Sequence, residues 1–170
     1  MKAPQIAEEL RARADADQKV RSRLPEQGPW PPDIAQEMRA IDTDNTAALR
    51  RIIDVHGWPG HALVGEGGAQ AAYLIAQHSP DPAFQRHARE LLAQAVESGD
   101  ARPSQLAYLT DRCLVAQGQM QIYGTQFYDL HDGAGYRPRP IADVTDLDVR
   151  RAAVGLEPWE QARARITGRP

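Results

Sequence analysis

The chain has 170 residues, of which 42% are hydrophobic and 25% charged, so it is long enough to bury a core of its own. A formal net charge of -3 excludes the strongly basic surface that nucleic-acid binding requires. Cys113, the single cysteine, excludes an intramolecular disulfide and a Cys-based zinc site. The N-terminal residues are charged, and no apolar run reaches the roughly 20 residues that span a bilayer. We expect one domain over residues 1–170, in the cytoplasm, without a nucleic-acid or membrane partner.

Apolar residues recur at helical intervals through most of the chain, and the runs are separated by prolines and glycines. A proline-rich connection at 24–32 follows the first run. Residues 42–45 are Asp, Thr, Asp and Asn, which favour a helix N-cap, so we expect one short helix before them and another after them that ends at Gly57. The expected helices cover about 4–23, 46–56, 69–78, 82–98, 103–117, 146–155 and 157–168, and residues 33–40 are expected to form a short helical segment.

The pattern changes after Gly118. Residues 119–130 alternate polar and apolar side chains, residues 131–135 are typical of a turn, and residues 136–141 predict a second strand. The predicted fold is therefore mainly α, a compact helical domain of about five to seven helices with a small appended β-hairpin.

Several short motifs lie in the middle of the chain. They are GWP at 57–59, VGxxGA at 64–69, Gln77 with His78, Gln85, Asp111 with Arg112, and GxxQxYGTQ at 118–126. As a set they resemble a widespread family of uncharacterised bacterial proteins, domain of unknown function 6624. The resemblance covers roughly the middle half of the chain. It implies a common fold and a common site, but it brings no established activity with it.

His78 ends a helix made almost wholly of small and apolar residues. Because histidine titrates near neutral pH, an imidazole at the edge of the core suits a general acid or base, with Asp111 or Asp81 to orient it. The alternative is a structural histidine, stabilised by the negative end of the helix and bonded to Asp81 or to a free carbonyl. His56, also at a helix end, is a second candidate imidazole with the same structural alternative.

Metal or phosphate binding has weaker support. The scattered donors His56, His78, Asp81 and Asp111 contain no pair at a typical metal-ligand spacing, so we expect neither a metal nor another cofactor. The glycines of residues 64–70 precede a helix, as in phosphate-binding loops, but no GxxxxGK[ST] motif is present. Close packing of the helix entrance explains these glycines as well.

Amide side chains gather after Gly118. In an alternating strand Gln119, Gln121 and Tyr123 project to one face, where they could bind a polar ligand. The alternative is a buried amide network that satisfies backbone groups of a loop. The adjacent Asp111 and Arg112 are either part of the site or a surface ion pair.

We expect a small enzyme that applies acid–base chemistry, with hydrolysis one option, to a polar small molecule or peptide. The alternative is a non-catalytic helical binding or protein-interaction domain, in which exposed Trp30 and Trp159 would contact the partner. The candidate catalytic residues are His78, Asp111 and His56. The candidate substrate-binding residues are Gln77, Arg112, Gln119, Gln121, Tyr123 and Gln126.

Overall fold

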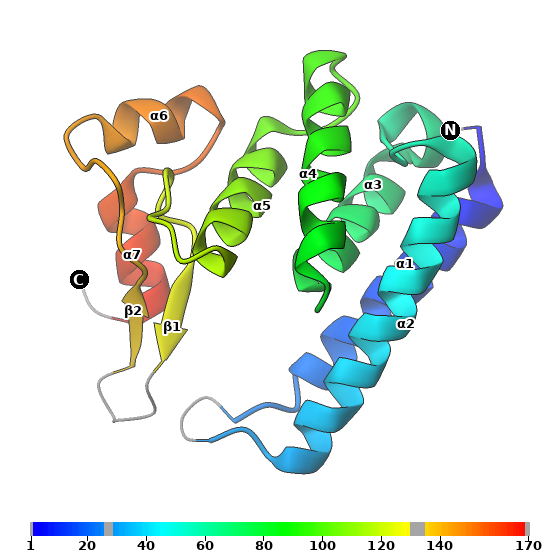
Figure 1. Ribbon diagram of the computed structural model, residues 1–170, viewed down its shortest axis with the longest axis horizontal. Coiled ribbons are helices and arrows are strands. Elements are labelled where there is room, and N and C mark those ends of the chain that lie inside the picture. Colours follow the sequence, from blue (N-terminus) through cyan, green and yellow to red (C-terminus); the bar gives the residue numbers. More distant parts are fainter. Residues whose placement is uncertain (1, 26–28, 130–134, 169–170) are drawn as a thin grey trace. The chain divides into compact units, whose positions relative to one another are not determined.

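The computed structural model describes residues 2–25, 29–129 and 135–168. Over these residues the chain forms seven helices and one two-stranded antiparallel sheet (Figure 1). The predicted fold class, mainly α with a small β-hairpin, is confirmed. The elements group into two compact units, which are described separately. The expected single domain over residues 1–170 stays a prediction.

The first unit consists of four helices: α1 (Pro4–Arg21), α2 (Pro32–His56), α3 (His61–His78) and α4 (Pro82–Glu97). α1 packs against both α2 and α3, and α3 packs against α4. The connection from α1 to α2 includes the described residues 24–25 and 29–31, whereas residues 26–28 lie outside the described part of the chain. Pro32 is the first residue of α2, where its missing N–H is not needed.

α2 is one continuous helix of 25 residues, so the two helices expected at 33–40 and 46–56 are wrong. The reason is that the polar residues expected to cap a new helix have tertiary partners instead. Asp42 accepts from Arg21, and Asn45 lies 3.3 Å from Arg13, both on α1. Thr46 Oγ1 donates to the carbonyl oxygen of Asp42 within the helix.

α3 begins earlier than expected, at His61, and contains a kink at Gly65, whose φ of 71° suits glycine. The Asp100 carboxylate accepts a hydrogen bond from the Ala62 N–H, and the Asp100 carbonyl accepts one from the His61 N–H. An acidic residue of the chain therefore binds the free N–H groups at the N-terminus of α3. Gly68 lies against α1, where an added Cβ would come within 3.2 Å of Ala7 Cβ. These contacts support the packing interpretation of the glycine-rich segment.

The second unit contains α5 (Pro103–Ala116), β1 (Phe127–Asp129), β2 (Tyr136–Pro138), α6 (Leu147–Ala153) and α7 (Trp159–Thr167). β1 and β2 pair antiparallel, with Phe127 opposite Pro138. The expected strand over residues 119–126 is wrong, because this segment is a loop with a single parallel bridge between Gln121 and Ile141. The expected turn at 131–135 falls largely on residues 131–134, outside the described residues.

The described helices include none with the length and apolar character needed to cross a membrane.

Candidate functional site

Asp17 occupies a core position of α1. The buried residues of this helix follow a helical stripe of Ala7, Leu10, Ala14, Asp17 and Val20. Asp17 is therefore a carboxylate placed where the pattern calls for an apolar side chain, and only 2% of the residue is exposed. A buried charge needs partners close by, because desolvation is costly.

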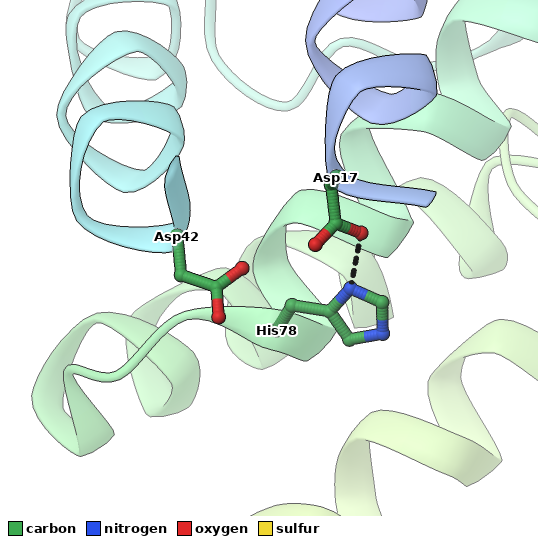
Figure 2. A group of neighbouring side chains, drawn as sticks. All are labelled: Asp17, Asp42 and His78. Atoms are coloured by element: carbon green, nitrogen blue, oxygen red, sulfur yellow. Dashed lines mark hydrogen bonds and ion pairs between the residues drawn. The ribbon is translucent and has the colours of Figure 1, made fainter. Parts of the chain in front are cut away.

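His78 supplies one of these partners. Its Nδ1 lies 2.7 Å from Asp17 Oδ2, and its side chain is 20% exposed. Figure 2 shows that the imidazole comes from the end of α3 and turns Nδ1 toward α1, with the other ring nitrogen on the side away from both aspartates. An ionised carboxylate can only accept, so Nδ1 donates and the neutral ring keeps its lone pair on Nε2. Asp17 is thus the acceptor, in place of the predicted Asp111 or Asp81.

Arg21 completes the cluster by linking two carboxylates. Its Nε donates to Asp17 Oδ1 at 2.6 Å, one helical turn away on α1. A terminal nitrogen of the same guanidinium lies 2.7 and 2.8 Å from the two oxygens of Asp42 on α2. Gln18 adds a further donor to Asp17 Oδ2 at 3.0 Å. We call Asp17, Arg21, Asp42 and His78 the α1–α3 cluster.

The cluster shifts the acidity of its two carboxyl groups in opposite directions. Burial acts to raise the pKa of Asp17, but the hydrogen bonds and positive charges of His78 and Arg21 together outweigh it and lower the pKa from 3.8 to about 2. The pKa of Asp42 lies above its ordinary value, because burial and the nearby charge of Asp17 outweigh the effect of Arg21. Asp17 is therefore ionised at neutral pH and accepts from the imidazole.

Local polar contacts hold the end of α3 that carries His78. Gln85 Nε2 donates to the carbonyl oxygens of Gln77 and Ser79, at 3.2 and 3.0 Å. Buried Ser79 lies 3.0 Å from Thr46 on α2. Asp81, expected to orient His78, instead caps α4 by accepting from the backbone N–H groups of its first turn. The end of α3 that carries His78 is therefore held by hydrogen bonds to its backbone carbonyls as well as by side-chain contacts.

The other predicted residues of the first unit are placed differently. Gln77 is buried, and its Oε1 has no hydrogen-bond partner among the described residues. His56 is exposed at the C-terminus of α2, and no hydrogen bond or ion pair joins it to His78 in the described chain. The structure therefore brings His78 together with Asp17, Arg21 and Asp42.

Asp111 organises the loop that follows α5. It is fully buried, and its two oxygens accept from the backbone N–H groups of Ile122, Tyr123 and Thr125 and from the Thr125 hydroxyl. Gly124 has a φ of 70° within this loop. The carboxylate therefore satisfies donors that the reversal of the chain would leave unpaired.

Gln121 and Gln126 form the buried amide network that was the alternative to ligand binding. Gln121 Nε2 donates to the carbonyl oxygens of Gln126 and Arg139, and its Oε1 accepts from the Gln126 N–H at 2.8 Å. Gln126 Nε2 lies 3.0 Å from the Thr125 hydroxyl. Gln119 is exposed outside this network. The Gln121 side-chain amide thus makes the hydrogen bonds to loop backbone groups that a neighbouring strand would make in a sheet.

Tyr123 and Arg112 are half-buried in the second unit. The Tyr123 carbonyl accepts from the buried Arg151 at 2.6 Å, so both backbone groups of Tyr123 are engaged by the protein. Among the predicted residues of this unit, Asp111, Gln121 and Gln126 therefore have a structural role.

Metal binding can be judged from donor geometry. Asp17, Asp42 and His78 offer three ligand atoms within 4.8 Å of one another. However, the guanidinium of Arg21 already lies within 2.6 to 2.8 Å of oxygens of both carboxylates and neutralises charge that would attract a cation. Arg21 therefore occupies the carboxylate oxygens that a cation would need, and the expected absence of a metal stays a prediction.

Asp17, Arg21 and Asp42 were missed as site residues in the sequence. One signal was available: Asp17 follows Ala7, Leu10 and Ala14 at intervals of three and four residues, which places an acid on the buried stripe. The partner at i+4, Arg21, adds to that signal. Asp42 carried no comparable signal, because an acid among Thr and Asn is typical of a helix cap.

Comparison with known proteins identifies a family. No curated protein and no solved structure matches the chain. The model of a family of unknown function, DUF6624, matches residues 4–167, which include both units and every residue of the α1–α3 cluster. The resemblance noted for the central motifs thus extends over nearly the whole sequence. The chain belongs to this family of unknown function, DUF6624.

Proposed function

We propose that the protein is a small acid–base enzyme acting on a polar small molecule, with His78 as the general base or acid. The observation that carries the proposal is the 2.7 Å contact between His78 Nδ1 and the buried carboxylate of Asp17. A carboxylate on Nδ1 fixes the orientation and tautomer of an imidazole and leaves Nε2 to exchange a proton. Asp17 takes the orienting role expected for Asp111 or Asp81.

The exposure of His78 is compatible with this role. Its side chain is 20% exposed, whereas the Asp17 side chain is only 3% exposed. In the proposed reaction Nε2 removes a proton from the substrate or from a water molecule, and the imidazolium that forms is stabilised by the negative charge of Asp17. The proton then returns to the leaving group. We favour hydrolysis as the reaction class and the cytoplasm as its location.

A shallow hollow that is open to solvent lies on α2. It has a volume of about 340 Å³ and is lined by Pro32, Ala35, Gln36 and Arg39. Arg39 precedes Asp42 by three residues on the same helix, so the hollow lies about one helical turn from the cluster. Gln36 and Arg39 offer it polar contacts.

The test compares two histidines that each end a helix. Wild type, His78→Ala and His56→Ala are assayed on a panel of p-nitrophenyl carboxylate and phosphate esters, with circular dichroism to verify folding. The rate of any ester that wild type hydrolyses should fall by about 100-fold or more in His78→Ala, as for loss of a general base, and remain near wild type in His56→Ala. Equal rates in folded His78→Ala and wild type would contradict the proposal.

A second candidate is a non-catalytic helical binding domain. The observation that favours it is that the Gln121 side-chain amide is bonded to backbone groups of Gln126 and Arg139, and that of Gln126 lies 3.0 Å from the Thr125 hydroxyl, so both amides have partners within the protein. Trp30 is 45% exposed and suits a contact with a partner. Trp159 is less suitable than predicted from the sequence, because it is half-buried and stacks on Phe127 at 5.8 Å.

The two candidates differ in what His78 does. In a binding domain the His78–Asp17 contact only joins α3 to α1. Melting temperature should then fall in His78→Ala while no member of the ester panel is hydrolysed by wild type.

A further inference from the structure

The Asp17 carboxylate is shared between a guanidinium and an imidazole, and each of the two contacts a different carboxylate oxygen. Arg21 Nε donates to Oδ1 at 2.6 Å, and His78 Nδ1 contacts Oδ2 at 2.7 Å. Asp17 can turn Oδ2 away from the imidazole only by breaking its contact with Arg21. The guanidinium cannot follow such a turn freely, because it is also bound to both oxygens of Asp42.

Arg21 also contributes to the net charge close to the His78 imidazole. The charged groups around the imidazole are Asp17 and Arg21 from α1 and Asp42 from α2. Asp81, at the start of α4, is engaged by backbone N–H groups and by Arg50. Without Arg21, the cluster would present carboxylates with no fixed cation, and its negative charge would hold the proton of an imidazolium more firmly. A histidine that holds its proton firmly is a poor base at neutral pH.

We propose that Arg21 is a positioning residue for His78: it fixes the acceptor oxygen of Asp17 and offsets the negative charge that would keep the imidazole protonated. This inference rests on the proposed acid–base function of His78. It assigns a part in the chemistry to a residue that need not touch the substrate. Asp42 has the opposite electrostatic effect on His78, while it anchors the guanidinium.

The chain contains a matched control in Arg13. Arg13 also lies on α1 and also joins this helix to α2, by ion pairing with Asp44 at 2.6 Å. Its side chain is 22% exposed, close to the 23% of Arg21. Asp44, however, is 71% exposed, and in the described part of the chain the Arg13 side chain bonds to Glu9, Asp44 and Asn45 rather than to Asp17 or His78. Replacing Arg13 therefore removes a comparable interhelical contact without touching the cluster.

The test is an NMR titration of the His78 ring nitrogens in the full chain. Wild type should have the proton of neutral His78 on Nδ1. In Arg21→Ala the midpoint of the titration should rise by about 0.5 to 1 pH unit, and the preference for Nδ1 should weaken. Arg13→Ala should leave both unchanged. Arg21→Lys, which restores the charge without the planar fork, should return the midpoint toward wild type but not the full Nδ1 preference.

A second variant gives an effect of opposite sign. Asp42→Asn removes a negative charge and should lower the midpoint of the His78 titration, so the inference can be tested even if Arg21→Ala does not fold. An unchanged midpoint in folded Arg21→Ala, or in Asp42→Asn, would overturn the inference.

The titration needs no substrate, so its outcome is separate from that of the ester assay. A shifted midpoint combined with full hydrolysis by His78→Ala would sink the proposed enzyme while leaving the electrostatic role of Arg21. An unshifted midpoint combined with lost hydrolysis in His78→Ala would overturn the role of Arg21 while leaving the proposed enzyme. Where both hold, the pH at which hydrolysis reaches half its maximum should rise in Arg21→Ala along with the His78 midpoint.

Discussion

His78 Nδ1 lies 2.7 Å from Asp17 Oδ2, although the two residues are 61 positions apart in the chain. The contact joins the last residue of α3 to a buried position of α1. Because Asp17 also accepts from Arg21, removing its carboxylate disturbs more than one helix contact. Asp17 should therefore matter for stability independently of any reaction.

Replacing Asp17 with Ala should lower the free energy of unfolding by roughly 3 to 5 kcal/mol, because Arg21 and His78 lose the charge that offsets their desolvation. Urea denaturation at pH 7 measures this. Glu9→Gln is a suitable control, since Glu9 pairs with Arg13 on the same helix but its side chain is 44% exposed. It should change the free energy by no more than about 0.5 kcal/mol. Equal effects of the two variants would contradict the buried role of Asp17.

Asp17 should also shape the acid limb of stability. Its pKa is about 2 in the folded protein and ordinarily 3.8, so the folded state binds this proton less tightly than the unfolded chain. The stabilisation, on the order of 2 kcal/mol, is present above about pH 4 and is lost as the pH falls through about pH 2. Asp42 opposes it, because a raised pKa makes its ionisation costly to the folded state.

Urea denaturation of wild type and Asp17→Asn at several pH values checks this. The difference in their free energies of unfolding should become smaller as the pH falls from about pH 4 toward pH 2. A difference that stays constant down to pH 2 would contradict the lowered pKa of Asp17.

Two adjacent glycines of α3 should respond in opposite ways to alanine. At Gly68 a Cβ would lie 2.7 Å from Val64 Cβ and 3.2 Å from Ala7 Cβ, so Gly68→Ala should destabilise the protein by about 1 to 3 kcal/mol. At Gly67 a Cβ would meet only the flexible Arg11 side chain, at 3.5 Å. Gly67→Ala should stabilise by about 0.5 to 1 kcal/mol, because alanine favours the helix. Thermal unfolding of both variants measures the difference, and a stable Gly68→Ala would contradict the close approach of α1.

Asp111→Asn should destabilise the second unit by about 3 kcal/mol or more, since an amide cannot accept at both positions where the carboxylate does. Hydrogen exchange at the amides of Ile122, Tyr123 and Thr125 should become faster in the same variant. Asp143→Asn is the control, because exposed Asp143 accepts from a single backbone N–H, that of Thr145. Unchanged exchange in Asp111→Asn would show that other groups hold the loop.

Addition of EDTA should leave the melting temperature of wild type unchanged, because Arg21 already binds the carboxylates of the α1–α3 cluster. A marked fall would contradict this prediction, since a bound metal stabilises the folded state by mass action. Arg21→Ala with added manganese is the informative companion. Removal of the guanidinium should allow Mn²⁺ to raise the melting temperature of the variant by more than that of wild type.

Local signals in the sequence were sufficient for several elements. The start of α4 follows from Asp81 as N-cap and Pro82 as first residue, and the structure has this cap. The apolar run before His78 likewise identified a buried helix. α6 and α7 were expected from their short amphipathic runs and are confirmed. In each case the determining contacts lie within one or two turns of the chain.

The cluster was harder to predict because its contacts join distant segments. Asp42 has the chemistry of a helix cap, yet an arginine 21 positions earlier is its partner and the helix continues past it. Gln121 and Gln126 have the chemistry of ligand-binding amides, yet Gln121 bonds to the backbone of Gln126, and the Gln126 amide bonds to the Thr125 hydroxyl. The type of a polar side chain tells which groups it can bond to, but not which partner it has in the folded protein. The packing of distant segments determines whether such a side chain binds a ligand or another part of the chain.

The α1–α3 cluster takes its members from three helices, with Asp17 and Arg21 from α1, Asp42 from α2 and His78 from α3. A partly folded chain in which α1 and α3 are apart has an imidazole without its acceptor, because Asp17 lies on α1 and His78 on α3. The orientation of the His78 imidazole therefore depends on the packing of α3 against α1. Any chemistry that depends on this orientation would start only after α1 and α3 have packed together.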